Sequence, residues 1–228
     1  METFARTELK YMLTKKQYEH LKEKAGERIV PALYSDSRVL SVYYDTEDQL
    51  LIRRSLEKPE YKEKLRIRVY DRINEDGRVF VELKKKCDGI VYKRRTGASY
   101  EELKEKGFST CAYEDEQVGK EIRWFEGNYE DLKPKVLIGV HRLSYTGEED
   151  PDLRITFDED VTYRQDDLDL SKGAYGQPLL PEGIVLMEVK TDNAMPLWLA
   201  RILSELGIYP NSFSKYGAVY EKCLAGGQ

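Results

Sequence analysis

Cysteine, histidine and long apolar runs are all scarce in this sequence. The three cysteines, Cys87, Cys111 and Cys223, have no CxxC spacing, and there are only two histidines. An odd number of widely spaced cysteines indicates neither a disulfide framework nor a zinc site. No apolar run approaches the ~20 residues of a membrane span, and the first residues lack the apolar core of a signal peptide. We therefore expect a cytoplasmic protein in a reducing environment.

The chain also lacks an excess of positive charge. Its 228 residues include 37 Lys and Arg against 42 Asp and Glu, which gives a net charge of −5. This balance argues against a general affinity for nucleic acid or anionic membranes, so no nucleic-acid partner is expected. With 40% hydrophobic residues the chain can build a core. Any anionic ligand must therefore meet a local cluster of basic residues.

What is abundant is alternation of apolar and ionised residues. Residues 61–86, YKEKLRIRVYDRINEDGRVFVELKKK, contain two such runs around an Asp76-Gly77 turn signal. In an extended chain this alternation places all the charge on one face. Similar strand-like segments cover residues 4–13, 38–44, 90–96, 134–145, 153–158 and 184–191, with 161–164 as a short additional candidate.

Helical patterns surround these strands. Thr14 and Gln17 form a capping-box signature at the start of the first helix, and Pro31 ends that segment. Residues 99–130 look like a helical insert, and C-terminal helices cover about 196–224. We expect a single domain over residues 1–228 of the α+β class: an eight-stranded antiparallel closed β-barrel with surrounding helices.

Cations are concentrated on one face of the expected strands. The ten cations are Lys10, Arg66, Arg68, Lys84, Lys93, Arg95, Arg142, Arg154, Lys190 and Lys215, and the four carboxylates are Glu8, Glu82, Asp158 and Glu188. A half-buried sheet that turns a polar face to water would explain any one strand. A barrel lumen lined by arginines instead requires water, carboxylates or an anionic ligand as compensation. The ligand implied is long and densely negative, such as a chain of phosphates.

The ordered motifs RTELKY, SVYYDT, KLRIRVYD, VFVELKKK, IVYKRRT, VHRLSY, LRITFDED, VLMEVKT and FSKY resemble a known family. They are similar to the VTC domain, the polyphosphate polymerase branch of the triphosphate tunnel metalloenzyme (CYTH-like) superfamily, from about residue 4 to 222. The resemblance implies an eight-stranded triphosphate tunnel. It also implies transfer of the γ-phosphate of ATP to a growing inorganic polyphosphate with Mn²⁺ or Mg²⁺.

The resemblance assigns roles to particular residues. It implies catalytic roles for Arg66, Arg68, Lys84, Arg142, Arg154 and Glu188. It implies phosphate binding by Lys10, Arg66, Arg68, Lys84, Lys93, Arg142, Arg154, Lys190 and Lys215, and strand phase adds Arg95 to this set. Glu188 is the expected metal ligand. Strand phase adds Glu8 and Glu82 as further candidates, although Glu82 could instead pair with a neighbouring arginine.

One position departs from the superfamily pattern. Its hydrolase and cyclase members open with Glu-x-Glu-x-Lys, whereas this chain has Arg6-Thr7-Glu8-Leu9-Lys10. The loss of one carboxylate favours the polymerase branch. The alternatives are a metal-dependent tripolyphosphatase or nucleoside triphosphatase, and a non-catalytic module that binds polyphosphate or inositol polyphosphate. If the protein exports polyphosphate, a separate membrane protein is expected to provide the passage.

Overall fold

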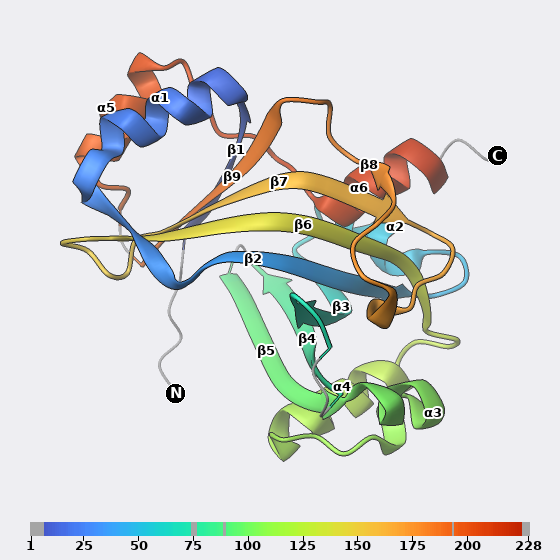
Figure 1. The fold of residues 1–228 in the computed structure, drawn as a ribbon. Helices are drawn as coiled ribbons and strands as arrows, with labels where there is room; N and C mark the ends of the chain where they lie inside the picture. Colours follow the sequence, from blue (N-terminus) through green and yellow to red (C-terminus); the bar gives the residue numbers. More distant parts are fainter. Residues whose placement is uncertain (1–6, 74–76, 89, 193, 225–228) are drawn as a thin grey trace. The chain divides into compact units, whose positions relative to one another are not determined.

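The computed structural model describes residues 7–73, 77–88, 90–192 and 194–224, and Figure 1 shows its elements. The strands are β1 Thr7–Thr14, β2 Ile29–Asp45, β3 Tyr61–Tyr70, β4 Arg78–Cys87, β5 Ile90–Ser99, β6 Lys133–Gly147, β7 Arg154–Arg164, β8 Gln177–Pro178 and β9 Ile184–Thr191. The α-helices are α1 Lys15–Ala25, α2 Leu50–Leu56, α3 Tyr100–Thr110, α4 Glu116–Gly127, α5 Leu197–Glu205 and α6 Lys215–Val219. Short helical turns are η1 Gly26–Arg28, η2 Leu170–Lys172 and η3 Tyr220–Leu224.

The strands form one hydrogen-bonded sheet. Its order is β1-β9-β7-β6-β2-β3-β4-β5, and β8 pairs with β7. Consecutive strands β3, β4 and β5 form an antiparallel meander, and β9 pairs antiparallel with both β1 and β7. The predicted antiparallel α+β fold is confirmed. In the part of the chain that the structure describes, the order ends at β1 and β5, so hydrogen bonds do not close the expected barrel.

The chain forms two compact units. The first unit comprises Met1–Arg38, Val140–Val161 and Pro178–Ser214, and the second comprises Val39–Gly139, Thr162–Gln177 and Lys215–Gln228. Each unit has its own apolar core. Because β2, β6 and β7 contribute residues to both units, the boundary follows no single loop.

The core of the first unit lies between its strands and the pair α1 and α5, which lie side by side in Figure 1. Helix α1 begins where its capping box predicts: the Thr14 hydroxyl accepts the N–H of Gln17, and the Gln17 side chain accepts the N–H of Thr14. Gln17 also donates to the carbonyl of Leu206, beyond α5, at 3.1 Å. The cap therefore fixes both the start of α1 and its connection to the other helix.

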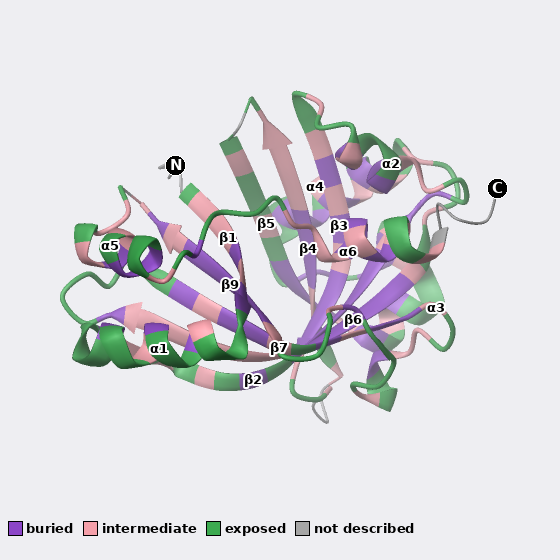
Figure 2. Cartoon of the chain, turned by 90° about the horizontal axis from the view of Figure 1, so that it is seen from above, coloured by how far each residue is buried: buried purple, intermediate pink, exposed green. Residues whose placement is uncertain are grey.

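The core of the second unit forms under α3 and α4. Leu65, Ile67 and Leu83 are at most 1% exposed and share a cluster with Ile122 and Phe125 of α4. Strand β3 accordingly alternates between buried and less buried residues along much of its length (Figure 2). One face of the β3–β4–β5 meander is therefore largely apolar and covered, and the other face carries most of the charges.

Several boundaries differ from those expected. Strand β2 begins at Ile29 and runs through Pro31, which was expected to lie between elements; proline is tolerated near the start of a strand. The candidate strand 161–164 is the end of β7. The Asp76 turn signal and Arg6 lie outside the described residues.

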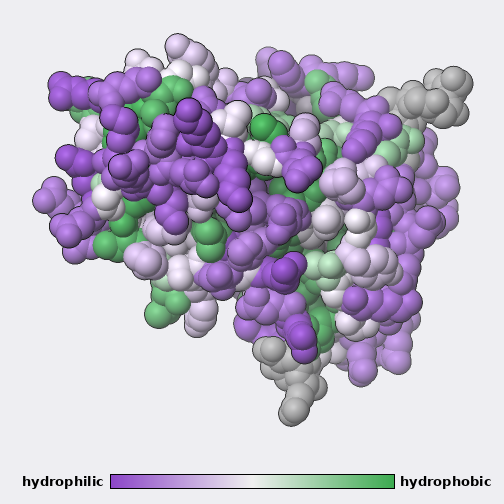
Figure 3. All heavy atoms as spheres, turned by 45° about the horizontal axis from the view of Figure 1, so that its top comes forward, coloured by the Kyte–Doolittle hydropathy of each residue, from purple (hydrophilic) through white to green (hydrophobic). Residues whose placement is uncertain are grey.

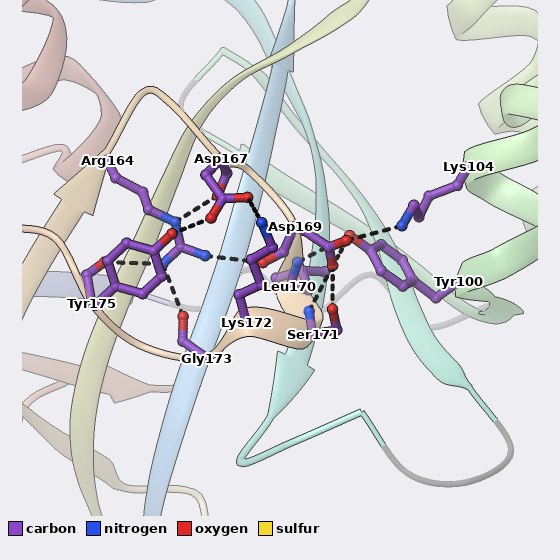
Figure 4. A network of polar contacts seen from close by, with 10 residues as sticks. All are labelled: Tyr100, Lys104, Arg164, Asp167, Asp169, Leu170, Ser171, Lys172, Gly173 and Tyr175. Atoms are coloured by element: carbon purple, nitrogen blue, oxygen red, sulfur yellow. Dashed lines mark hydrogen bonds and ion pairs between the residues drawn. The ribbon is translucent and has the colours of Figure 1, made fainter.

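The expected loop 165–182 is organised by a buried arginine. The Arg164 guanidinium donates to the backbone carbonyls of Asp167, Asp169, Gly173 and Tyr175 at 2.7–2.9 Å, and these groups surround it in Figure 4. Its side chain also stacks on the Tyr175 ring, 4.0 Å from the centroid. Because backbone carbonyls accept the hydrogen bonds of this guanidinium, we assign Arg164 a structural role in the loop.

A carboxylate joins the same loop to helix α3. Asp169 accepts hydrogen bonds from the Ser171 N–H, from the Lys104 ammonium at 2.9 Å and from the Tyr100 hydroxyl at 3.2 Å (Figure 4). Burial alone would raise the pKa of Asp169, but the bonds from Ser171 and Lys104 hold it well below its usual range. The carboxylate is therefore ionised and fixes the loop against α3.

The hydrophilic character of the surface agrees with the high content of charged residues in the sequence. In Figure 3 hydrophilic residues cover most of the face in view, and hydrophobic residues reach it in scattered patches. No helix among the described residues is long and apolar enough to cross a membrane.

Candidate anion-binding site

The charged face of the β3–β4–β5 meander is built by strand register. Arg66, Glu82 and Arg95 lie directly opposite one another, and the next positions along this face are Arg68 in β3 and Lys84 in β4. Because side chains alternate across a strand, residues two apart share a face and directly opposed residues meet. The register therefore gathers five of the predicted phosphate ligands, Arg66, Arg68, Lys84, Lys93 and Arg95, on one surface.

Glu82 lies at the centre of this face. Its side chain is only 2% exposed, and four cations surround it. The guanidinium of Arg66 contacts Oε2 at 2.6 and 2.7 Å, the Lys93 ammonium lies 2.9 Å from Oε1, and Arg68 and Arg95 are each at 3.6 Å. Oε1 has the ion-pair contacts with Lys93 and Arg95 but no hydrogen bond among the described residues.

This environment keeps Glu82 ionised. Burial alone would raise the pKa of its carboxyl, but the charges of Arg66, Arg68 and Lys93 outweigh burial and hold the pKa far below its usual value. A carboxylate that four cations surround is well placed to orient them. The geometry therefore supports an orienting role for Glu82 over its candidacy as a metal ligand.

Two of the surrounding arginines have further fixed contacts. The Arg95 guanidinium stacks on the Phe80 ring, 3.6 Å from its centroid, and Arg68 donates to the Ser41 hydroxyl at 3.1 Å. Such contacts restrict side-chain rotation and so reduce the entropy that binding a ligand would otherwise cost. The cluster is preorganised.

The same face continues as a row of three lysines, of which Lys84 and Lys93 were predicted from the sequence and Lys64 was not. Lys64 of β3 lies opposite Lys84 of β4, which lies opposite Lys93 of β5; we call these three residues the lysine row. One step further, Lys62 lies opposite Lys86, and Lys62 also donates to the Ser55 carbonyl at 3.1 Å. Like charges in directly opposed positions destabilise a sheet. The alternation KEKLR was the available signal, but only the register shows that these lysines meet.

Lys215, the first residue of α6, belongs to this second unit as well. It acts electrostatically on Tyr43, which lies opposite Arg66 on the charged face. Tyr43 was not predicted from the sequence, because an aromatic residue at the end of an apolar strand is indistinguishable from a core residue.

The first unit carries a second charged surface. Glu8, Lys190 and Arg154 lie opposite one another on β1, β9 and β7, and the next row holds Lys10, Glu188 and Thr156. Glu8 lies 3.5 Å from Lys10, and Glu188 lies 3.2 Å from Lys190. Lys10 also donates to the Phe213 carbonyl at 3.0 Å. Each of the two carboxylates thus lies beside cations on this face, which we call the chequered surface.

Arg142 has a partner of its own in the first unit. Its guanidinium donates to both oxygens of Asp158 at 2.6 and 2.7 Å, and the Asp158 side chain is fully buried. This is the planar two-bond geometry in which arginine binds carboxylates and phosphates alike. The two hydrogen bonds to Asp158 fix the orientation of the Arg142 guanidinium.

The chequered surface fits a divalent metal at Glu188. The Thr156 hydroxyl oxygen is buried, makes no hydrogen bond among the described residues and belongs to the residue directly opposite Glu188. No group of three or more His, Cys, Asp or Glu residues gathers as a ligand set in the described parts of the chain. Mg²⁺, however, commonly binds through one or two carboxylates, with water and substrate phosphates completing its shell. Glu188 supplies one such carboxylate, and the Thr156 hydroxyl belongs to the residue directly opposite it.

The structure thus brings the predicted residues together in two sets. Lys10, Arg154, Glu188 and Lys190 share the surface of the first unit with Glu8, and Arg142 pairs with Asp158 in the same unit. The remaining predicted ligands lie in the second unit. Residues that the sequence reasoning did not single out are Tyr43, Lys62, Lys64, Lys86 and Thr156.

An antiparallel α+β fold that carries clustered cations around buried carboxylates has the features expected of an anion-binding domain. The chain belongs to the VTC domain family, whose model matches residues 5–224. The resemblance inferred from the ordered motifs is therefore confirmed. No functionally curated protein gave a significant match.

Several solved structures are similar to this chain at low sequence identity. A putative adenylate cyclase from Bacillus halodurans aligns with a TM-score of 0.56 at 15% identity, over 92% of this chain and 95% of that chain. A putative adenylate cyclase from Vibrio parahaemolyticus has a TM-score of 0.47 at 11% identity, with 98% and 99% covered. A putative adenylyl cyclase from Hippeastrum, described as having a dominant triphosphatase activity, has a TM-score of 0.46 at 14% identity, with 94% of each chain covered.

Proposed function

We propose that this protein is a polyphosphate polymerase that transfers the γ-phosphate of ATP to a growing inorganic polyphosphate chain. Membership of the VTC domain family supports phosphate-chain chemistry. The observation that carries the proposal is the lysine row, because it extends the cationic surface beyond the cluster around Glu82. ATP and inorganic polyphosphate or triphosphate are the proposed ligands, and the reaction is proposed to take place in the basic tunnel expected of the family.

The extent of the charged face favours a polymer over a short ligand. From Lys62 to Arg68 it spans seven residues of β3, and the six steps between them correspond to about 20 Å at ~3.4 Å per residue. Eight cations lie along it, and Glu82 is the one carboxylate at the same positions of the three strands among the described residues. A nucleoside triphosphate offers only three phosphoryl groups to such a surface. A longer phosphate chain supplies negative charge to every row.

The proposed chemistry requires positioning and charge neutralisation. In phosphoryl transfer the protein mainly aligns the reactants and stabilises charge on the migrating group. The terminal phosphate of the acceptor chain is already ionised, so no side-chain base is needed. Arg66, Arg68 and Lys84 would bind phosphate oxygens, as would Arg142 and Arg154. These five, with Glu188, are the proposed catalytic residues.

Glu188 is the proposed carboxylate ligand of Mn²⁺ or Mg²⁺. When bound, the metal would neutralise charge on phosphate oxygens. We expect Glu188→Gln to lose metal-dependent turnover while keeping its ability to bind tripolyphosphate without metal, because Lys190 and the other cations remain. Calorimetric titration with tripolyphosphate in the presence of a chelator separates the two effects. Full turnover in the Gln variant would contradict the metal-ligand role.

Electrophoresis of the reaction products tests the proposed activity. The protein is incubated with ATP and Mn²⁺ or Mg²⁺, chains are visualised with a polyphosphate stain, and free phosphate is measured in parallel. Stained chains are expected. Free phosphate alone would instead identify a triphosphatase, and tight binding of chains without turnover would identify a non-catalytic module.

The lysine row offers a sharper test of chain binding. We expect Lys64→Ala and Lys84→Ala to weaken binding of long polyphosphate more than binding of tripolyphosphate. Lys85→Ala is the matched control: Lys85 is adjacent in sequence but occupies the opposite face, near the Trp124 ring. Equal losses for long and short chains in the two row variants would contradict a role for this row in binding a polymer.

A further inference from the structure

Tyr43 is a buried tyrosine whose hydroxyl lies among the cations. It is 7% exposed and sits directly opposite Arg66 in the β2–β3 register. The Arg66 guanidinium donates a hydrogen bond to the Tyr43 oxygen at 2.9 Å. Arg66 is the same residue that contacts Glu82 through its other nitrogens. The Arg66 guanidinium therefore bridges the Tyr43 oxygen and Glu82, the carboxylate at the centre of the charged face.

The hydrogen of this hydroxyl has no acceptor among the described residues. A phenol can accept and donate at the same time, and the bond from Arg66 uses only its accepting capacity. A buried donor without a partner costs about 1–3 kcal/mol, so such groups generally mark a role or an absent partner. An acceptor that approaches Tyr43 here would also meet the positive charges of Arg66 and Arg68.

The Tyr43 ring is held in place by the terminal helix. It stacks on the ring of Tyr216 with centroids 5.2 Å apart and an interplanar angle of 27°. The Tyr216 hydroxyl donates to Asp45 at 2.9 Å, and Asp45 also accepts the N–H groups of Leu51 and Ile52. The start of α2 is thus connected through Asp45 to α6. Tyr43 is preorganised beside Lys215, the residue before Tyr216.

The charges around the stacked pair shift the pKa values of the two phenols in opposite directions. Burial alone would raise the pKa of Tyr43, but the charges of Arg66, Arg68 and Lys215 outweigh it and lower the pKa to about 8. For Tyr216, burial and the Asp45 carboxylate both raise the pKa. Tyr216 therefore remains a neutral donor to Asp45. The charged groups with the largest effect on Tyr43 are cations: Arg66 and Arg68 of β3 and Lys215 of α6.

We propose that Tyr43 is a further phosphate-binding residue, whose hydroxyl donates a hydrogen bond to an oxygen of the polyanion held by Arg66. The inference rests on phosphate binding at the charged face, which is part of the proposed function, but it does not require turnover. Phosphate oxygens are strong acceptors, and a bond from a neutral donor to an ionised acceptor is stronger than one between neutral groups. A hydroxyl also discriminates by direction, which a lysine ammonium does not.

This assignment has a consequence for pH. A phenol that has lost its hydrogen cannot donate, and its negative charge repels the ligand. Bound polyanion must then favour the protonated phenol and raise its pKa, by linkage. Affinity is expected to fall as the pH rises through about 8, the pKa of free Tyr43. The phosphate ligand's own titration is common to all variants and cancels in their comparison.

Binding of tripolyphosphate to Tyr43→Phe tests the proposal. The variant keeps the ring that stacks on Tyr216 and removes only the hydroxyl. Isothermal titration at pH about 7 is expected to show roughly a tenfold or greater loss of affinity, the effect of one hydrogen bond to a charged group. The loss relative to wild type should shrink at pH about 9, where the wild-type phenol is ionised. Tyr44→Phe is the matched control, because Tyr44 packs against Phe108 in the apolar core.

A spectroscopic titration reports on the hydroxyl itself. Ultraviolet absorbance of tyrosinate is followed against pH with and without tripolyphosphate. The wild type should show a phenol that titrates near 8 and moves to higher pH when the anion binds, and Tyr43→Phe should lack this transition. Tyr70→Phe is measured in parallel, because Tyr70 is a second tyrosine with a lowered pKa. Burial alone would raise the pKa of Tyr70, but the charges of Arg68 and Arg95 outweigh burial.

Two results would overturn the proposal. Unchanged tripolyphosphate affinity in Tyr43→Phe at pH about 7 would show that the hydroxyl contacts no phosphate. A transition that is lost in Tyr43→Phe and kept in Tyr70→Phe, but that the anion does not move, would do the same. Absence of polyphosphate synthesis would refute the proposed activity alone, because neither measurement depends on turnover.

Discussion

Replacing Glu82 by glutamine should destabilise the ligand-free protein strongly. The substitution keeps the shape of the side chain but removes the charge that four cations share at 2.6–3.6 Å. Breaking a buried ion pair by removing one partner costs about 3–5 kcal/mol, because the other charge is left uncompensated. With four cations and one carboxylate, we expect at least ~3 kcal/mol. This is a large share of the ~5–15 kcal/mol that stabilises a typical domain.

Urea unfolding followed by circular dichroism measures the effect, and an exposed pair provides the control. Arg78 and Glu114 form a two-bond ion pair at 2.5 and 2.7 Å, but both side chains are about half exposed. Glu114→Gln should therefore cost at most ~1 kcal/mol. Glu82→Asp, which keeps the charge, should be intermediate. A Glu82→Gln variant no less stable than Glu114→Gln would refute the compensating role of Glu82.

A polyanion should rescue the Glu82→Gln variant. If tripolyphosphate binds the same cations, it supplies the missing negative charge and raises the midpoint of unfolding more in the variant than in the wild type. Equal stabilisation of both proteins would show that the anion binds elsewhere. Added tripolyphosphate also allows the comparison if the variant fails to fold alone.

The pH dependence of stability provides a further check on Glu82. Its pKa in the folded protein is depressed below the ordinary value of 4.5. The resulting stabilisation is present above the unfolded pKa and is lost as the pH falls toward the folded pKa. The wild type should therefore lose stability below pH ~4.5, and Glu82→Gln should lose less over the same range.

Two backbone features yield further predictions. Thr14→Ala removes the cap of α1 and should lower the free energy of unfolding by about 1 kcal/mol in urea; no change would mean that packing alone fixes the helix start. Gly176→Ala should cost at least ~2 kcal/mol, because its φ of 152° suits glycine and a Cβ would lie 2.3 Å from the Tyr163 carbonyl oxygen. Gly26→Ala, with φ of 53° and open space around the Cβ, should cost only ~1 kcal/mol by thermal unfolding, and equal losses at both sites would contradict the steric argument.

Alternation in the sequence was sufficient to predict much of the charged face. It placed Arg66, Arg68 and Glu82 on the same side of their strands, and the register confirms that Arg66 and Glu82 are directly opposed. The Thr14 capping box was also predicted and is present. These features depend on residues close in sequence, or on a hairpin pairing that the pattern itself favours.

Features that depend on distant segments could not be predicted in this way. The stacking of Tyr43 on Tyr216 joins β2 to the last helix, and neither residue has a distinctive local pattern. The lysine row depends on register across three strands, because a shift of two positions would place different residues beside Lys84. In the sequence, nothing distinguishes Arg164 from other cations near strand ends, whereas in the structure it donates four hydrogen bonds to backbone carbonyls. Local pattern gives the face of a residue, and tertiary contacts decide its partner.

The partners of the cations determine which of them imply a ligand. Backbone carbonyls accept the hydrogen bonds of Arg164, and Arg142 pairs with the carboxylate of Asp158. The cluster around Glu82 differs, because four cations share one carboxylate and the lysine row adds like charges beside it. Like charges held close together on one face repel one another, and a polyanion that binds across them relieves this repulsion. The gathering of these cations on one face of the meander, more than the number of basic residues in the chain, is therefore the physical reason to expect a polyanion there.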